Sequence, residues 1–165
     1  MRSPHATFEE LLGVLDRVVA RLAALQQTPR EYGTGVPLHG GEIHTIQAIG
    51  KSVGTNVTQL AERMGVTKGA VSQMVSKLVE KGVVRKARAQ DNAKEVVLTL
   101  TELGRIGLRN HERFDMEVLE TVREYCGSDL EIKLGAFLSV MNDFDAILTL
   151  HEERQRSAGP GREGE

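Results

Sequence analysis

The segment from Val57 to Leu78 constrains the fold of this chain more than any other part of the sequence. It predicts two short helices separated by a tight turn, because Gly65 follows the first helical run and Thr67 precedes the second. Glycine adopts the positive φ that such a turn requires, and threonine can cap a helix by accepting a hydrogen bond from an amide of its first turn. Ala61 is small at the point where the two helices must cross closely. This spacing is typical of a helix-turn-helix.

The first short helix is predicted from Gln59 to Met64 with Thr58 as its cap, and the second from Lys68 to about Lys81. Gly82 supplies the C-terminal stop of the second helix. Apolar residues that recur at helical spacing are expected to face the core. These residues are Val66, Val71, Met74, Val75 and Leu78.

The other face of the second helix carries small and hydrogen-bonding side chains, which favours contact with the major groove of double-stranded DNA. Gln73 can read adenine through two hydrogen bonds, and Ser72 can reach bases or phosphates. Thr67 and Lys68 stand at the positive end of the helix dipole, which suits a phosphate. The alternative is a buried helix pair that carries small residues at these offsets by chance. The predicted DNA-binding face comprises Thr67, Lys68, Gly69, Ala70, Ser72, Gln73, Ser76 and Lys77.

A basic β-hairpin is predicted directly after the second helix, with strands at residues 83–88 and 95–100 and a loop at residues 89–94. Such a loop can lie over the minor groove, where A·T-rich narrowing attracts basic side chains. The alternative is that these charges protect an exposed sheet edge. The hairpin residues predicted to bind DNA are Arg85, Lys86, Arg88 and Lys94.

Charge is distributed unevenly along the chain of 165 residues, whose net charge is −2. The stretch from Lys51 to Asn110 holds eleven Lys and Arg but five Asp and Glu, an excess of six positive charges. The remaining residues therefore carry an excess of eight negative charges. A basic segment inside an acidic protein is the electrostatic footprint of a nucleic-acid-binding lobe.

Long amphipathic helices are predicted at both ends of the chain. Apolar residues three and four apart run from Phe8 to Leu25, and this helix is expected to end before Thr28-Pro29. A loop with Gly33, Gly35 and Pro37 follows, and then a helix from about 38–41 to Gly50. Towards the C-terminus, Thr101 caps a long helix that breaks at Gly127-Ser128, and a last helix carries apolar residues from Leu130 to Leu148.

The run from Asn56 to Gly82, continued by Val83-Val84-Arg85-Lys86, resembles the MarR family of winged-helix transcription regulators. The stretch Leu98-Thr-Leu-Thr-Glu-Leu-Gly104 is similar to that family's exit from the hairpin, or wing, into a long helix. The resemblance covers Phe8 to about Leu150. It departs from the family at Asp91-Asn92-Ala93-Lys94, where the family's wing carries Asp-x-Arg. A lysine lacks the planar fork of arginine, so Lys94 is not an equivalent substitute for that arginine in the minor groove.

The resemblance implies an obligate homodimer that reads a pseudo-palindrome, with half-sites about 34 Å apart, and repression is the family's usual mode. The residue pattern also favours a homodimer, because one small lobe cannot cover apolar stripes at both ends of the chain. The expected fold is mainly α with a small β-hairpin wing, namely a winged helix-turn-helix with N- and C-terminal dimerisation helices. The predicted dimer interface comprises Phe8, Leu11, Leu15, Leu138, Met141 and Leu148.

The expected domain organisation has three parts. Residues 1–30 and 102–150 form the helical dimerisation region, and residues 38–101 form the winged helix-turn-helix lobe that binds DNA. Residues 151–165 are expected to form a disordered tail, because their last part has almost no apolar content.

The effector implied by the resemblance is a small ligand, for instance a small aromatic molecule, bound between the dimer helices and the lobe. The histidines add a second possibility, a metal such as zinc, because imidazole nitrogens and carboxylate oxygens from two helices can hold one. The alternative is that these histidines are surface or interface residues at helix ends. The candidate metal ligands are His39, Glu42, His44, His111 and Asp115.

The remaining features exclude several classes. A single cysteine, Cys126, rules out an internal disulfide framework and fits a cytoplasmic protein. No apolar run approaches the length of a membrane span, and no secretory signal is expected. No nucleophile elbow, phosphate loop or His-Glu-x-x-His is found, so an enzyme is not expected. The alternative function is a winged-helix module that binds another protein and not DNA.

Overall fold

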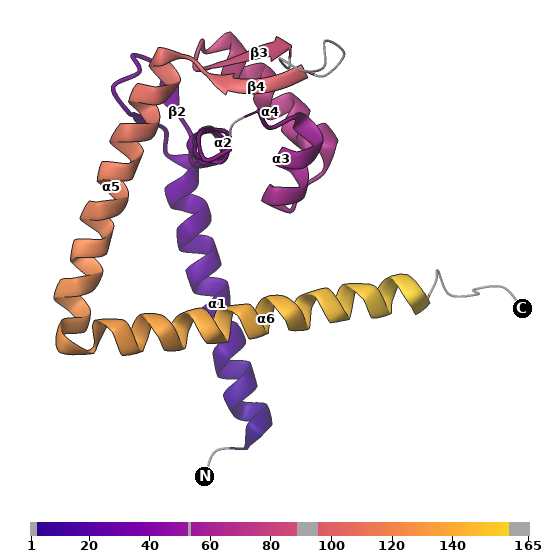
Figure 1. Cartoon of the computed structure of the whole chain (residues 1–165). Coiled ribbons are helices and arrows are strands. Elements are labelled where there is room, and N and C mark those ends of the chain that lie inside the picture. The colour runs from indigo at the N-terminus through magenta and orange to yellow at the C-terminus, as the bar shows by residue number, and fades with distance from the viewer. Residues whose placement is uncertain (1–2, 53, 89–95, 159–165) are drawn as a thin grey trace, which may run out of the picture. The chain divides into compact units, whose positions relative to one another are not determined.

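The computed structural model describes residues 3–52, 54–88 and 96–158 (Figure 1). The fold is mainly helical, with a small β-hairpin and long helices near both ends of the chain, which confirms the predicted class. The chain forms two compact units, Met1–Asp115 and Met116–Glu165. The described ranges contain no helix that is both long and apolar enough to cross a membrane.

Helix α1, Pro4–Gln27, begins the first unit. The Ser3 hydroxyl caps it by accepting a hydrogen bond from the amide of Ala6. Proline is tolerated at position 4, because an amide at the first helical position would have no hydrogen-bond partner inside the helix. The helix ends before Thr28-Pro29, as predicted. Within the described part of the chain, no residue of α1 is buried. The apolar stripe of α1 is therefore not covered by the rest of the described chain.

A short ribbon follows α1 where the sequence predicts an irregular loop. Strand β1, Arg30–Glu31, pairs antiparallel with β2, Pro37–Leu38, and the turn between them uses Gly33 and Gly35 at positive φ. The prediction of a plain loop is wrong for these strands. Two residues are too few for the alternation of apolar and polar side chains that reveals a strand in a sequence.

Three helices form the centre of the first unit, namely α2, Gly40–Gly50, α3, Val57–Met64, and α4, Lys68–Glu80. The bounds of α4 and its Thr67 cap confirm the prediction, and Gly65 ends α3 with φ 65°. The cap of α3 is Asn56 and not the predicted Thr58, because the Asn56 side chain accepts a hydrogen bond from the Gln59 amide. The helix therefore starts two residues earlier than predicted.

The wing is an antiparallel hairpin of β3, Val84–Arg88, and β4, Val96–Leu100, as predicted. The register pairs Arg85 with Thr99 and Arg88 with Val96. The predicted loop at residues 89–94, including Lys94, lies outside the described residues.

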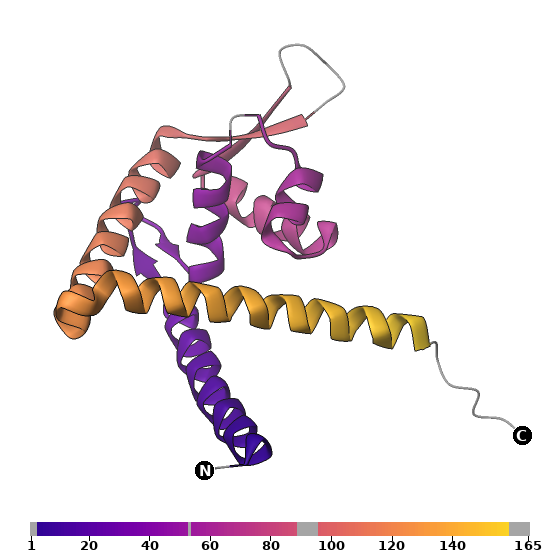
Figure 2. The same ribbon diagram turned by 60° about the horizontal axis from the view of Figure 1, so that its bottom comes forward.

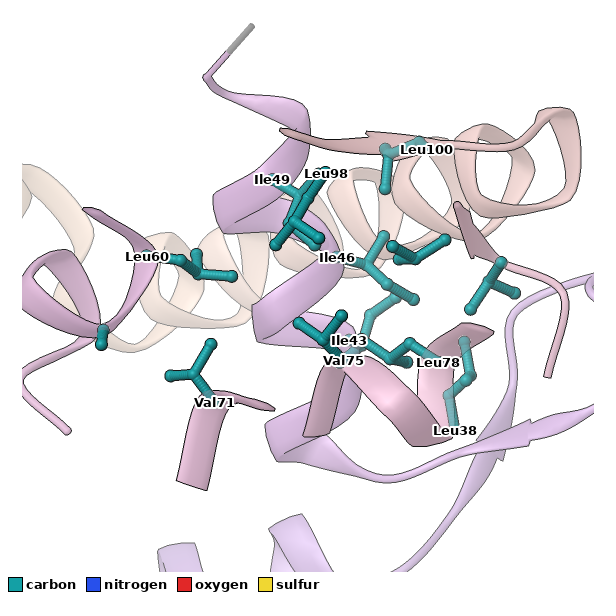
Figure 3. Packing of buried hydrophobic residues seen from close by; sticks show 13 residues of the cluster. Leu38, Ile43, Ile46, Ile49, Leu60, Val71, Val75, Leu78, Leu98 and Leu100 are labelled. Atoms are coloured by element: carbon teal, nitrogen blue, oxygen red, sulfur yellow. The ribbon is translucent and has the colours of Figure 1, made fainter. Parts of the chain in front are cut away.

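The core of the first unit lies between α2, α3, α4 and the hairpin (Figure 3). Each element contributes aliphatic side chains that point towards one another, for example Ile46 from α2, Val75 from α4 and Leu98 from β4. Each fully buried side chain of this kind contributes about 1.5–3 kcal/mol to folding. Val71, Val75 and Leu78 are buried as predicted, and Met74 is half-buried. Val66 is not a core residue, because it lies in the turn between α3 and α4 and is 46% exposed.

Helix α5, Glu102–Cys126, starts in the first unit, and the Thr101 hydroxyl caps it by accepting a hydrogen bond from the Gly104 amide. The start of the helix packs very closely on the backbone of Val83, the residue that leads into the wing. A Cβ on Gly104 would lie 2.0 Å from the carbonyl oxygen of Val83, so no larger residue fits there without movement.

The second unit holds the end of α5, a 3-10 turn at Gly127–Asp129 and helix α6, Leu130–Ala158. Figure 2 shows α6 as one uninterrupted helix. The predicted disordered tail at residues 151–165 is therefore wrong for residues 151–158. The reason is local, because Glu152 pairs with Arg156 one turn later at 3.4 Å and His151 contacts Gln155 at 2.9 Å. Residues 159–165 lie outside the described residues.

Candidate nucleic-acid interface

Helix α4 presents two chemically different faces. Val71, Val75 and Leu78 are buried against the core and fix the helix in place. All eight residues of the predicted DNA-binding face are exposed. They are Thr67, Lys68, Gly69, Ala70, Ser72, Gln73, Ser76 and Lys77. The exposed face combines small residues with hydrogen-bond donors and acceptors, which is the chemistry that a major groove requires.

The N-terminus of α4 has the features that are expected from the sequence to suit a phosphate. The Thr67 hydroxyl accepts a hydrogen bond from the Ala70 amide at 3.2 Å, so the cap leaves the amides of Lys68 and Gly69 without a partner inside the helix. Lys68 adds a positive charge to the positive end of the helix dipole. Further along the helix, the Ser76 hydroxyl donates to the carbonyl of Ser72 at 3.0 Å, which leaves its oxygen to accept.

The three basic residues of β3 are exposed but do not share one face. Lys86 and Arg88 are two residues apart on β3 and lie on one side of the strand, whereas Arg85 lies on the other side. The Arg85 Nε donates to the Thr99 hydroxyl across the hairpin at 3.0 Å. Lys86 and Arg88 therefore form the pair that can approach a phosphate or a minor groove together.

The five candidate metal ligands are not assembled into one site. Among the described residues, no group of three or more His, Cys, Asp or Glu side chains could hold a metal ion. His39 and Glu42 are engaged elsewhere, because the His39 Nδ1 lies 3.1 Å from the Gln27 carbonyl oxygen and Glu42 pairs with Lys81. The structure does not bring these five candidates together, because spacing on a helix does not fix which partner a carboxylate finds.

His111 is a buried histidine in the first unit. Its ring packs against Tyr32 at 5.6 Å and against the exposed His44 at 5.4 Å, measured between ring centroids. Its Nδ1 lies 3.7 Å from the Asp115 Oδ1 and has no hydrogen-bond partner among the residues described. Burial lowers the pKa of His111 more than the nearby Asp115 carboxylate raises it, so the neutral ring is favoured.

The sequence did not reveal a buried ion pair between Glu42 and Lys81. Glu42, on α2, is 4% exposed, and its Oε2 accepts from the Lys81 Nζ at 2.7 Å and from the His39 amide at 2.8 Å. Burial raises the pKa of Glu42, but the hydrogen bond and charge of Lys81 and the His39 amide outweigh it, so the pKa is lowered. The two residues are far apart in the chain, and no local pattern marks such a pair.

A cavity of about 300 Å³ lies in the first unit between the end of α2, β4 and the start of α5. Its lining is mostly apolar and includes Ile49, Leu98, Leu100 and Leu108, with Arg105 as the charged member. A pocket of this size and composition fits the lower range of small-molecule sites.

The residues of the predicted dimer interface are exposed or half-buried. Phe8 and Leu11 on α1 are exposed, and Leu15 is half-buried. Leu138, Met141 and Leu148 on α6 are exposed. Exposed large apolar side chains at helical spacing mark a surface for a partner.

Comparison with known proteins connects these features to a family. Residues 34–95, which include β2, the three helices α2 to α4 and strand β3, match the sequence model of the MarR family. The uncharacterized HTH-type transcriptional regulator YhjH of Bacillus subtilis (strain 168) is 36% identical over 81 residues, which cover 49% of this chain and 46% of that protein. The HTH-type transcriptional regulator PchR of the same organism is 31% identical over 78 residues, covering 47% and 46%. The matched segment thus spans about half the length of these relatives.

Solved structures share the fold over most of the chain. FabT of Streptococcus pneumoniae, determined in complex with DNA, aligns with a TM-score of 0.66 and 24% identity over 88% of this chain and 99% of that chain. The MarR family transcription regulator SP03579 aligns with a TM-score of 0.69 and 18% identity over 90% and 96%. At these identities the likeness establishes the fold, a winged helix-turn-helix with long terminal helices.

Proposed function

The chain belongs to the MarR family of HTH-type transcriptional regulators, and from this premise we propose that it binds double-stranded DNA sequence-specifically. Helix α4 enters the major groove and the hairpin β3–β4 lies near the minor groove. The observation that carries the proposal is the division of α4 into a buried aliphatic face and an exposed face of small and hydrogen-bonding residues, which continues onto its cap Thr67. FabT, a structure of the same fold, was determined in complex with DNA, which supports the same use here.

The protein acts as a homodimer in this proposal. The exposed apolar residues of α1 and α6 supply the surface that a second copy covers. A two-fold axis places two copies of α4 in successive major grooves about 34 Å apart, so the operator is a pseudo-palindrome. Repression follows when such an operator overlaps a promoter.

A small ligand is proposed to modulate DNA binding. The apolar cavity beside Arg105 supports this class of effector, because its aliphatic lining can cover a ring, and the Arg105 guanidinium, whose Nε already pairs with Glu102 at 3.0 Å, adds a positive charge to the lining. Footprinting on the DNA upstream of the protein's own gene, with and without small phenolic acids, tests the effect. Zinc serves as the comparison in this experiment, and release by zinc alone would contradict the small-ligand proposal.

Charge reversal distinguishes DNA binding from the alternative, a module that binds another protein. Replacing Lys68, Lys77, Arg85 and Lys86 with Glu should abolish DNA affinity at every salt concentration, measured by fluorescence anisotropy. A control variant reverses four exposed cations of α5 and α6 and changes the net charge equally. These are Arg113, Arg123, Lys133 and Arg154. Equal losses in both variants, or undiminished affinity in the first, would refute the proposed DNA surface.

A further inference from the structure

Lys81 anchors the C-terminal end of α4. It follows the last helical residue, and its Nζ donates to the Glu42 Oε2 at 2.7 Å and to the Pro37 carbonyl oxygen at 2.8 Å. The Lys81 side chain is 26% exposed and that of Glu42 is 6% exposed, so the pair is largely removed from water. A hydrogen-bonded ion pair in such surroundings tolerates little change in geometry, because displacement leaves a charge buried without its partner.

The carboxylate that holds Lys81 also belongs to the junction between α1 and α2. The Glu42 Oε2 accepts a hydrogen bond from the backbone amide of His39, the residue before α2. The ring of the same His39 contacts the carbonyl oxygen of Gln27, the last residue of α1, at 3.1 Å. Three polar contacts therefore connect the end of α1 to the end of α4.

Close packing reinforces this junction. A Cβ on Gly40 would lie 3.0 Å from the Cα of Gln26 and 2.8 Å from its Cγ. The first residue of α2 thus lies directly against the last turn of α1. Movement of α1 towards α2 at this point would therefore press on the start of α2, the helix that carries Glu42.

We propose that His39, Glu42 and Lys81, here called the relay, are positioning residues that transmit the placement of α1 to helix α4. The inference rests on the proposed function, because α4 is the helix assigned to the major groove and α1 carries part of the proposed dimer surface. The relay does not touch DNA. It sets the orientation of α4, and dimer geometry or an effector that moves α1 changes DNA affinity through it.

The first test separates positioning from direct DNA contact. Lys81→Met keeps the apolar stem but removes both hydrogen bonds, and it should weaken DNA binding by between about twofold and thirtyfold. The slope of log affinity against log salt should stay that of the wild-type protein, because no phosphate contact is lost. Lys77→Met, at a proposed phosphate contact, should instead reduce the slope by about 1 for each copy. Lys133→Met, an exposed lysine of α6, controls for the lost charge.

A shallower slope in Lys81→Met would mean that Lys81 contacts DNA, and unchanged affinity would mean that it does not position α4. Either result overturns the inference. Lys81→Arg should restore part of the affinity, because the charge and donors return. Circular dichroism and thermal unfolding establish that each variant is folded.

The second test measures coupling along the relay. His39→Phe retains a ring but removes the contact with the Gln27 carbonyl oxygen. The double variant with Lys81→Met should bind DNA no more weakly than the worse single variant, because both changes break the same connection. Independent, multiplicative losses would show that His39 and Lys81 act separately.

A readout without DNA separates failure of the relay from failure of the proposed function. The amides of Lys81 and Gly82 donate to carbonyl oxygens of α4, so their hydrogen exchange reports the fixation of this helix end. Exchange should speed up at these amides in both Lys81→Met and His39→Phe. Unchanged exchange refutes the relay even if the protein binds DNA. Accelerated exchange in a protein that binds no DNA refutes the proposed function and leaves the relay as a structural connection.

Discussion

Among the glycines that the structure describes, Gly104 is the one where an added methyl group should lower the stability of the fold most. Helix α5 starts against the backbone that leads into the wing, and a Cβ at Gly104 would lie 2.0 Å from the Val83 carbonyl oxygen and 3.0 Å from its carbon. The obstacle is backbone and not the flexible end of a side chain. The same carbonyl oxygen accepts the amide of Thr101 at 3.1 Å, so moving it also strains the start of α5.

Three contributions determine how much Gly104→Ala lowers the free energy of unfolding. Overpacking costs about 1–3 kcal/mol, and a backbone obstacle places Gly104→Ala at the upper end of that range. Loss of the bond from the Thr101 amide adds about 1 kcal/mol. Alanine regains about 1 kcal/mol of helix propensity. The net destabilisation is about 3 kcal/mol, which lowers the unfolding midpoint by about 6–12 °C for a chain of this size.

Thermal unfolding followed by circular dichroism, at one fixed protein concentration, measures this effect. Gly69→Ala is the matched control, because the nearest atom to its Cβ is the Thr67 Oγ1 at 4.0 Å. The control should keep or slightly raise the midpoint. If Gly104→Ala unfolded within about 1 °C of the wild-type protein, the close packing of α5 on the wing would be refuted.

Three further predictions concern the surface, the assembly and pH. Gln73→Ala should cost about 1–3 kcal/mol at one base position and relax specificity there, whereas Lys77→Ala should weaken all sequences alike, as measured by competition binding. Leu15→Asp or Leu138→Asp should give monomers by light scattering and lose DNA binding; a DNA-competent monomer would contradict the dimer. Because the pKa of His111 is lowered on folding, stability should be full above its unfolded pKa of about 6.5 and decline as pH falls below it, and His111→Leu should flatten this dependence in thermal scans.

The elements that the sequence predicted correctly carry their signals locally. Gly65 and Gly82 have positive φ and end α3 and α4, and Thr67 and Thr101 cap the following helices with their own hydroxyl groups. Each of these signals acts within four residues of the helix end. The exposed face of α4 was predictable for the same reason, because it is the complement of a buried stripe at helical spacing.

Several of the errors have the opposite property, since they depend on contacts between distant residues or on a choice between equivalent neighbours. Asn56 and Thr58 are both good caps, and only the folded chain shows which one is used. Glu42 has the chemistry of a metal ligand, but tertiary structure brings Lys81 to it. Val66 is apolar at helical spacing, yet the tight turn leaves it exposed. Such choices are made by tertiary packing, which spacing along the sequence does not encode.

The central claim is that two copies of α4 contact one duplex together. Hydroxyl-radical footprinting of the bound upstream DNA tests it most directly, since the method resolves single nucleotides. Two protected patches are expected, related by a pseudo-two-fold axis and about one helical turn, or 10 base pairs, apart. A single patch, or no protection even at low salt, would contradict it.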